Sequence, residues 1–518
     1  MVYLALVILI AIVIIEITSK IIKIPSPVLL VIAGSIIGFL PGIPAINIPP
    51  EIMLLIFLPP LLFGEAWTIP KRELFLYRRP VGLLSIGLVV AITFSVGYAT
   101  HYFIPDIPLF VGFILGAILS PTDAVAVSSI IEKLRVPQSI SIILRGESLI
   151  NDASGLVAFK FALLAATTGY FSPIEALNGF ALVTIGGITI GFLLALSVEY
   201  LGKFLARYHL SNYYIEISIS LISPFIAYIS AEHFQFSGII AVVVAGLYSG
   251  WKDLTTLSHN CRSHLKSVWA TLLFLLNGIM FILLGLHLPV ILQYPHNESF
   301  LQLFIYAVII FSIMLVTRII WTFCGAYIPR YIFKSLRVAN PNLDPFQVFI
   351  VAWGGMRGTI TVIAAFSIPL NSHFDGARNL IIHLAFIVTI FSLLVQGLSL
   401  PWIIKKLKVQ NLPKNELHDI KLKLVDAAIN KIYYVEANHE IIKRITAEYQ
   451  RLREHIIYSI KDLKGEHREE IELRKISLEA EKDELLQLYK NNIIDEEVFK
   501  KIRDEIEIKL KPIDNFLE

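Results

Sequence analysis

Polar and titratable residues concentrate in one short stretch of an otherwise apolar run, namely Arg145, Glu147, Ser148, Asn151, Asp152 and, about two turns later, Lys160. At about 100° per residue on a helix, Ser148, Asp152 and Arg145 share one face, whereas Glu147 and Asn151 lie on the adjacent face. Asp152 and Ser148 can therefore face a cavity that admits an ion. Glu147 can turn toward another helix and pair with a cation.

Two further segments combine helix-breaking residues with polar ones. The first reads Ser120-Pro121-Thr122-Asp123, and the second reads Gly354-Gly355-Met356-Arg357-Gly358. Pro121 removes an amide donor and clashes with the preceding turn, so a helix should break there and restart at Thr122-Asp123, whose oxygens suit a positive helix N-terminus. The three glycines weaken the second helix and free its carbonyl groups. We expect two interrupted helices.

Composition places these segments in a membrane. The chain has 56 % hydrophobic and only 16 % charged residues, with a mean hydropathy of +0.70. This is more apolar surface than a water-soluble core can hide, so the sequence predicts an all-α protein with many spans. A net charge of +3 gives no indication of nucleic-acid binding. Cys261 and Cys324 lack a CxxC spacing, which argues against disulfides and zinc.

Apolar runs long enough to cross the hydrocarbon layer number about 13. They lie near 2–18, 26–43, 51–67, 81–103, 107–131, 137–167, 178–202, 212–231, 236–250, 264–287, 299–328, 345–369 and 379–404. Every second loop is basic, with Lys20 and Lys23 in the first, Arg135 in a later one, and Lys334 and Arg337 in the last. The positive-inside rule then predicts an external N-terminus and a cytoplasmic C-terminal end. The two interrupted helices would run in opposite directions, as inverted repeats around an ion site do.

From about Asn411 onward the composition changes to Lys, Glu, Ile and Leu. This composition predicts amphipathic helices, as a hairpin or a coiled coil, in a cytosolic tail over residues 409–518. An oligomerisation or stabilising role and a regulatory role with an unknown ligand are both compatible with it.

The three polar segments together closely resemble the core motifs of the cation:proton antiporter-1 family, in its bacterial NhaP-like branch of sodium/proton antiporters. The resemblance covers roughly residues 1–405 in order and spacing. It implies a 13-helix antiporter domain over residues 1–408, with a core of about 81–167 and 299–404. The remainder, about 1–67 and 178–287, would form a homodimer in the plasma membrane among its lipids. The core would move in an elevator-like cycle, with Na⁺ (or Li⁺ or K⁺) and H⁺ as transported ions and no cofactor.

The resemblance also implies roles for single residues. Asp152 corresponds to the carboxylate that binds either the metal cation or the proton, with Thr122 and Ser148 as oxygen ligands. Asn151 stands where electrogenic relatives have a second aspartate, which implies electroneutral one-for-one exchange. Glu147 and Arg357 correspond to a buried ion pair that joins the sixth and twelfth spans. Asp123 corresponds to a residue that steadies the unwound chain at the crossing and contacts the ion through water.

Four other residues have roles that depend on their surroundings. Arg145 or Lys160 is a candidate to compensate the charge of Asp152, or to be its structural partner. Arg318, in the eleventh span, is expected to bond carbonyl groups of a broken helix. Many relatives have an acidic residue directly after Leu-Pro-Pro-Leu-Leu-Phe, but here Gly64 follows Phe63 and the carboxylate is Glu65.

The chemistry of exchange also follows from the residues alone. Desolvation disfavours a bare carboxylate in a membrane, so Asp152 should hold either a proton or a cation, and the loaded site crosses at lower cost than the empty one.

Alternatives are a K⁺/H⁺ antiporter, a Na⁺-coupled symporter for an organic solute and a cation channel. Interrupted helices around one ionisable site favour alternating access over a channel. An enzyme is disfavoured because no nucleophile with a base, metal set or phosphate loop is evident.

Overall fold

The fold is described from a computed structural model, which covers residues 2–22, 24–40, 50–105, 107–134, 136–169, 173–208, 210, 212–256, 259–293, 299–332, 344–369, 375–407, 409, 414–432, 442, 444–450, 453, 466–490, 502–503 and 506. The chain divides into two compact units, residues 1–411 and 412–518. Within the described residues, every regular element is a helix, which confirms the predicted all-α class.

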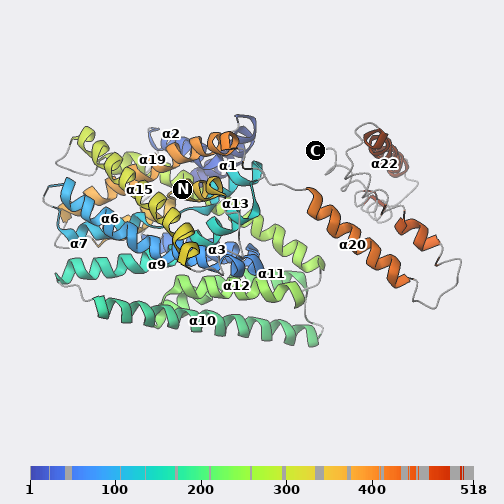
Figure 1. The fold of residues 1–518 in the computed structure, drawn as a ribbon, viewed down its shortest axis with the longest axis horizontal. Helices are drawn as coiled ribbons and strands as arrows, with labels where there is room; N and C mark the ends of the chain where they lie inside the picture. The colour runs from blue at the N-terminus through green and yellow to red at the C-terminus, as the bar shows by residue number, and fades with distance from the viewer. Residues whose placement is uncertain are drawn as a thin grey trace. The chain divides into compact units, whose positions relative to one another are not determined.

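The helices of the first unit follow one another along the chain (Figure 1). They are α1 (Val2–Ile22), α2 (Ser26–Gly38), α3 (Pro50–Thr68), α4 (Lys71–Leu76), α5 (Arg78–Gly82), the π-helical η1 (Leu83–Gly87), α6 (Leu88–Phe103), α7 (Leu109–Leu119), α8 (Ala124–Lys133), α9 (Gln138–Thr168), α10 (Pro173–Arg207), α11 (Tyr213–His233), α12 (Gly238–Thr256), α13 (His259–Leu286), α14 (Leu288–Gln293), α15 (Phe300–Ile332), α17 (Pro345–Trp353), α18 (Thr359–Phe366) and α19 (Asp375–Leu407).

Each predicted span contains one of these helices or a broken pair of them. In the described part of the chain, 8 helices are long and apolar enough to cross a membrane, and 26–38, 52–68 and 238–252 are shorter apolar helices. The total of about 13 spans and the orientation of the termini stay predictions. The loop cations Lys23, Arg135, Lys334 and Arg337 lie outside the described residues.

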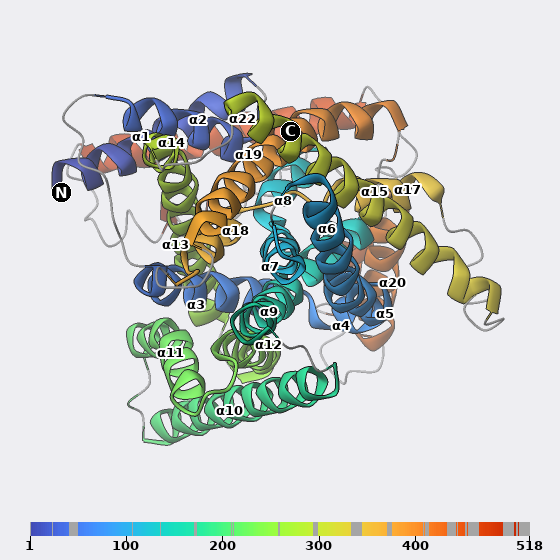
Figure 2. The ribbon, with the colours of Figure 1, turned by 90° about the vertical axis from the view of Figure 1, so that its left-hand side faces the viewer.

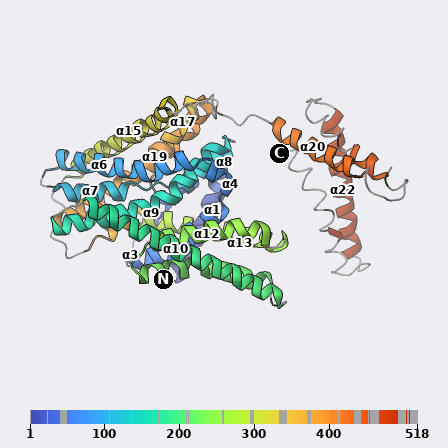
Figure 3. The ribbon, with the colours of Figure 1, turned by 60° about the horizontal axis from the view of Figure 1, so that its bottom comes forward.

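The helices of this unit pack in two groups. In one, α1, α2, α3, α11, α12 and α13 contact one another and α10 lies against α11 and α12. In the other, α6 contacts α7 and α15, while α19 contacts α15, α17 and α18. Helix α9 packs on α7 and α8 but also reaches α3 and α12, so it lies where the groups meet (Figures 2 and 3). The division of this unit into a core part and a dimerisation part stays a prediction.

The two interrupted helices break at the predicted residues and cross. Helix α7 ends at Leu119 and α8 begins at Ala124, while α17 ends at Trp353 and α18 begins at Thr359. The amide of Asp123 donates to the carbonyl of Met356 at 2.8 Å, which joins the two unwound segments directly. A Cβ atom on Gly358 would lie 2.4 Å from Oδ2 of Asp123, so this close approach requires glycine.

A π-helical turn interrupts the predicted span 81–103 beside α9. Its Ser85 carbonyl accepts a hydrogen bond from the Ser154 hydroxyl, and its Leu83 carbonyl accepts one from Trp321 Nε1 at 3.1 Å. Carbonyls freed by the wider turn are thus bonded within the protein, as a membrane interior requires.

The second unit is helical as predicted. It contains α20 (Lys414–Ile432) and α22 (Glu466–Lys490). Arg453 Nε contacts Asp426 Oδ1 at 2.7 Å, and Leu485 and Ile506 form a small apolar cluster with Leu478. The predicted hairpin or coiled coil stays a prediction.

Helices α2 and α13 pack so closely that Gly34→Ala should destabilise the protein. A Cβ atom on Gly34 would lie 2.2 Å from the Ile282 carbonyl oxygen, and backbone cannot move aside as a flexible side chain does. We expect a loss of about 1–3 kcal/mol, the usual cost of overpacking. Thermal unfolding of the purified protein in detergent measures it. Gly202→Ala is the control, because a Cβ atom added there would meet no other atom within 4 Å; equal melting temperatures for both variants would contradict the packing described.

Candidate functional site

A cavity of about 30 Å³ lies where the two broken helices meet α9, α3 and α13. Its lining combines apolar side chains with polar ones: Leu61, Leu62, Glu65, Pro121, Thr122, Asp123, Val125, Ser148, Asp152, Asn277, Gly358, Thr359, Ile360 and Thr361. Three carboxylates, those of Glu65, Asp123 and Asp152, therefore border one small space. This volume corresponds to about one water molecule.

Asp152 has a carboxylate oxygen with capacity left for a ligand. Its side chain lies in the middle of α9 and is 4 % exposed. Its Oδ1 atom is buried and accepts no hydrogen bond in the described part of the chain. Buried polar atoms are nearly always bonded, so an unbonded carboxylate oxygen beside a cavity suggests a ligand there.

Ser148 ties α9 to the first unwound segment. Its hydroxyl donates to the Thr122 carbonyl at 2.6 Å and accepts from the Ala124 amide at 3.1 Å. A hydroxyl oxygen has two lone pairs, so one remains available after the Ala124 contact. As the helical periodicity predicted, Ser148 and Asp152 lie at the same cavity.

Asn151 and Thr122 hold each other in place. Asn151 Nδ2 donates to Thr122 Oγ1 at 2.7 Å, and the Thr122 amide donates to Asn151 Oδ1 at 3.4 Å. The Thr122 hydroxyl donates in turn to Glu147 Oε1 at 3.3 Å. Thr122 lines the cavity, and its hydroxyl, which donates to Glu147 and accepts from Asn151, keeps one lone pair as the Ser148 hydroxyl does. Its role as a metal ligand stays a prediction.

Asp123 caps the N-terminus of α8. Its Oδ1 accepts from the Val125 amide at 2.8 Å and from the Ala126 amide at 3.3 Å. The carboxylate thus satisfies amides that have no partner inside the helix and lies at the positive end of its dipole. This confirms the capping role expected from the sequence.

Glu147 pairs with Arg318, so the predicted pair with Arg357 was wrong. The Arg318 guanidinium contacts the two carboxylate oxygens of Glu147 at 2.5 and 2.8 Å, and both side chains are at most 1 % exposed. Arg318 also donates to the carbonyls of Ala352 at 2.9 Å and Val351 at 3.2 Å, which confirms its predicted role. Its five donors in a planar fork allow one arginine to serve the carboxylate and the end of α17 together.

Arg357 serves the other broken helix instead. Its Nη1 atom donates to the carbonyls of Ser120 at 3.1 Å and Pro121 at 3.2 Å, at the end of α7. The C-termini of α7 and α17 each therefore have a buried arginine against their free carbonyls. A positive charge there stabilises the negative end of the helix dipole.

Lys160 has a different partner from the one predicted, and the role of Arg145 in compensating Asp152 stays a prediction. The Lys160 side chain is 63 % exposed and pairs with Glu232 of α11 at 3.6 Å, so the expectation that it compensates Asp152 was wrong. It lies about two turns along α9 from Asp152 and is not among the residues that line the cavity. Arg145 Nε donates to Ser128 Oγ of α8 at 3.1 Å.

The structure adds one residue that the sequence reasoning missed and places another that it left open. Asn277 lines the cavity from α13, where it is an amide inside the apolar run Leu-Leu-Phe-Leu-Leu-Asn. A lone polar residue in a predicted span was the signal available. Glu65 lines the same cavity from α3, despite its shift of one position relative to many relatives.

The ligands for a cation would be oxygen atoms of hydroxyl, amide and carboxylate groups rather than a dense cluster of His, Cys, Asp or Glu side chains. Within the described residues, no group of three or more His, Cys, Asp or Glu is placed to hold a metal ion. Ser148 and Asp152 from α9, with Glu65 and Asn277 from the facing helices, supply oxygen atoms of the kind that alkali cations prefer.

The chain is similar to known proteins in sequence and in fold. A family model described as "Sodium/hydrogen exchanger, transmembrane" matches residues 6–406. A sodium, potassium, lithium and rubidium/H(+) antiporter of Bacillus pumilus (strain SAFR-032) is 34 % identical over 490 residues, covering 92 % of this chain and 72 % of that protein. The protein of the same name in Bacillus subtilis (strain 168) is 30 % identical with the same coverage. Among solved structures, the sodium proton antiporter MjNhaP1 from Methanocaldococcus jannaschii at pH 8 matches with a TM-score of 0.60 and 21 % identity, covering 77 % of this chain and 97 % of that one.

Removing one member of the Glu147–Arg318 pair should destabilise the fold strongly. Glu147→Ala leaves a buried guanidinium without its counter-charge, which costs about 3–5 kcal/mol. We expect a much lower folded yield and melting temperature, with partial recovery when Arg318→Ala is combined with it. Lys160→Gln is the control, because exposed ion pairs contribute about 0–1 kcal/mol. A double-mutant cycle should give a larger coupling for Glu147 with Arg318 than with Arg357; the reverse order would contradict the assigned pair.

Proposed function

This chain belongs to the sodium/hydrogen exchanger family, and we propose that it exchanges an alkali cation for a proton at Asp152. The observation that carries the proposal is the unbonded, buried Oδ1 of Asp152 beside a cavity of about 30 Å³. The proton and the cation would occupy the same place in turn. Competition at one carboxylate is then sufficient to couple their movements.

The oxygen atoms around the cavity support cation binding at Asp152. The remaining lone pair of Ser148 lies on the same helix, and Glu65 and Asn277 face it from α3 and α13. Bound Na⁺ or H⁺ neutralises the carboxylate, whereas the empty site keeps a charge that is costly in hydrocarbon. The loaded site would therefore change sides and the empty site would stay.

We propose that the site moves in an elevator-like cycle. The cavity lies between the two packing groups, because the unwound segment 121–123, α8, α9 and α18 line one side and α3 and α13 the other. A shift of the group that contains α7 and α18 against the group that contains α3 and α13 would move Asp152 from one side of the membrane to the other. The crossing of the broken helices would stay intact. Helices outside this group, α1 to α3 and α10 to α13, remain the candidates for contacts in a homodimer.

The stoichiometry that we propose is one cation for one proton. Asn151, next to Asp152, has no ionisable group, and its amide nitrogen and oxygen each bond Thr122. Asp123 is fixed as a helix cap. Glu65 belongs to the facing group, so its charge would not travel with the site. One carboxylate then binds and releases one charge of either kind.

A second candidate function is the exchange of K⁺, rather than Na⁺ or Li⁺, for H⁺. The two Bacillus antiporters whose names include potassium and rubidium match 92 % of this chain, including part of the second unit. A symporter for an organic solute is disfavoured, because the cavity at Asp152 has about 30 Å³, whereas pockets for small molecules have about 300–1,000 Å³. A multi-pass location in the plasma membrane, with the tail in the cytoplasm, accompanies the proposal.

Asp152→Asn and Asp152→Ala should both abolish exchange in proteoliposomes that contain a pH dye. Neither side chain can alternate between a proton and a cation, so the rate should fall to that of empty liposomes with Na⁺, Li⁺, K⁺ and Rb⁺ alike. Asn151→Ala should slow exchange, because it frees Thr122. Glu16→Gln on α1, away from the cavity, is the matched control and should exchange normally. Wild-type rates for Asp152→Asn would refute the mechanism.

Exchange by the wild type should be independent of membrane potential. One positive charge enters for each one that leaves, so no net charge crosses the bilayer. Setting the potential with a K⁺ gradient and valinomycin, while Na⁺ drives the exchange, should leave the initial rate unchanged. With Na⁺ leaving and H⁺ entering, a rate that rises steadily as the potential is made more negative inside would mean that more than one proton moves per cation.

A further inference from the structure

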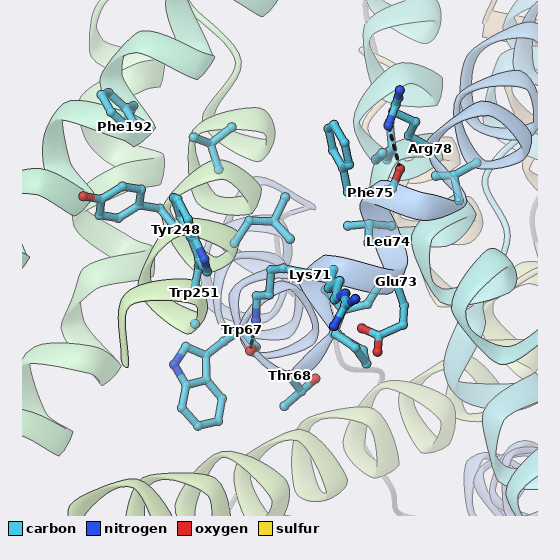
Figure 4. Close-up of a pocket in the computed structure, with 18 of the residues that line it drawn as sticks. Trp67, Thr68, Lys71, Glu73, Leu74, Phe75, Arg78, Phe192, Tyr248 and Trp251 are labelled. Carbon is cyan, nitrogen blue, oxygen red and sulfur yellow. Dashed lines mark hydrogen bonds between the residues drawn. The ribbon is translucent and has the colours of Figure 1, made fainter. Parts of the chain in front are cut away.

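A second cavity, of about 1110 Å³, shares no lining residue with the cavity at Asp152. It is bounded by α4, α5 and Ile150 of α9 on one side and by α10, α12 and α13 on the other. Figure 4 shows Phe192, Tyr248 and Trp251 on one side of it and Leu74, Phe75 and Arg78 across from them. It therefore lies between the two packing groups of the membrane unit.

The cavity is strongly basic. Its charged lining residues are Lys71, Arg72, Arg78, Arg262 and Lys266, against the single carboxylate of Glu73. Such a lining repels the transported cations and attracts an anion, so this space is unsuited to be their route to Asp152.

Within the described residues, Arg72, Arg262 and Lys266 have hydrogen-bond donors without a protein partner, whereas Lys71 and Arg78 each bond a backbone carbonyl. Lys71 Nζ donates to the Trp67 carbonyl at 2.5 Å, and Arg78 Nη1 donates to the Phe75 carbonyl at 3.2 Å. Arg72, Arg262 and Lys266 are exposed and make no salt bridge or side-chain hydrogen bond in the part of the chain that the structure describes. They come from α4 and α13, on opposite sides of the cavity, so one anionic group can be held between them.

Apolar and aromatic side chains surround the basic ones. Phe75 and Trp251 are exposed by 67 % and 59 %, and the Arg78 guanidinium lies 4.1 Å from the centre of the Phe75 ring. Phe192, Val244 and Leu247 continue the lining along α10 and α12. Aromatic residues mixed with Arg and Lys at the ends of spans are typical of the boundary between lipid and water.

We propose that this cavity binds one acidic phospholipid of the adjacent leaflet, which the loop charges predict to be the cytoplasmic one. Its phosphate would lie between Arg72, Arg262 and Lys266, and an acyl chain would follow the apolar wall of α10 and α12. The apolar wall favours a lipid over a soluble phosphate, which has nothing to place there. Because the two sides belong to different packing groups, a bound lipid would bear on the movement of one against the other.

The test is retention of phosphatidylglycerol by the full chain, compared with phosphatidylcholine, in native mass spectrometry from mild detergent. The variant is Arg72→Gln/Arg262→Gln/Lys266→Gln, and the control, Lys20→Gln/Lys405→Gln/Lys406→Gln, removes the same charge from the same predicted side. Each cavity cation should contribute about fivefold to retention, so the variant should lose about a hundredfold. The control should retain the lipid as the wild type does, and Arg72→Lys/Arg262→Lys should largely restore it.

Three results would overturn the proposal. Equal retention by the cavity variant and the control would show that overall charge, not this cavity, attracts the lipid. Equal retention of both lipids by the wild type would remove the role of the headgroup charge. Displacement of phosphatidylglycerol by inorganic phosphate at equal concentration would assign the cavity to a soluble anion. None of these results bears on exchange at Asp152, so the two proposals fail independently.

Discussion

Two helices that unwind inside an apolar bundle leave carbonyl and amide groups that the protein itself must satisfy, since hydrocarbon offers no partner. The buried polar residues of this chain meet that requirement around the crossing. The Asp123 amide bonds the Met356 carbonyl, and Asp123 caps α8 with its side chain. Arg318 and Arg357 bond the free carbonyls of α17 and α7. The result is a fixed frame of charges and dipoles in which Asp152 keeps an unbonded oxygen.

The two carboxylates of α9 divide the work within this frame. Both Nη atoms of Arg318 contact Glu147, which is 0 % exposed. The charge of Glu147 is therefore compensated, and the pair joins α9 to α15 and α17. Asp152, on the face that borders the cavity, pairs with no arginine among the residues that the structure describes. Facing helices supply Glu65 and Asn277 there. A buried ion pair suits a joint between helices, whereas a carboxylate without a counter-charge suits a ligand that comes and goes.

Much of this arrangement followed from local rules. Pro121 and the glycines of 354–358 predicted the breaks, because both effects act on the backbone of their own helix. The period of α9 placed Ser148 and Asp152 on one face, and the oxygens of Asp123 predicted its cap. Partners across helices were harder. Periodicity gives the face that Glu147 presents but not which of two buried arginines lies opposite. It also did not predict that Lys160 pairs with Glu232 on another helix.

The central claim is that a cation and a proton compete for Asp152. Calorimetric titration of the purified protein with NaCl, in two buffers of different ionisation enthalpy, counts the protons released as the cation binds. The account predicts release approaching one proton per cation at a pH where the site is protonated, declining as the pH rises, and no binding heat in Asp152→Asn. Cation binding that releases no proton at any pH, or release that persists in Asp152→Asn, would contradict it.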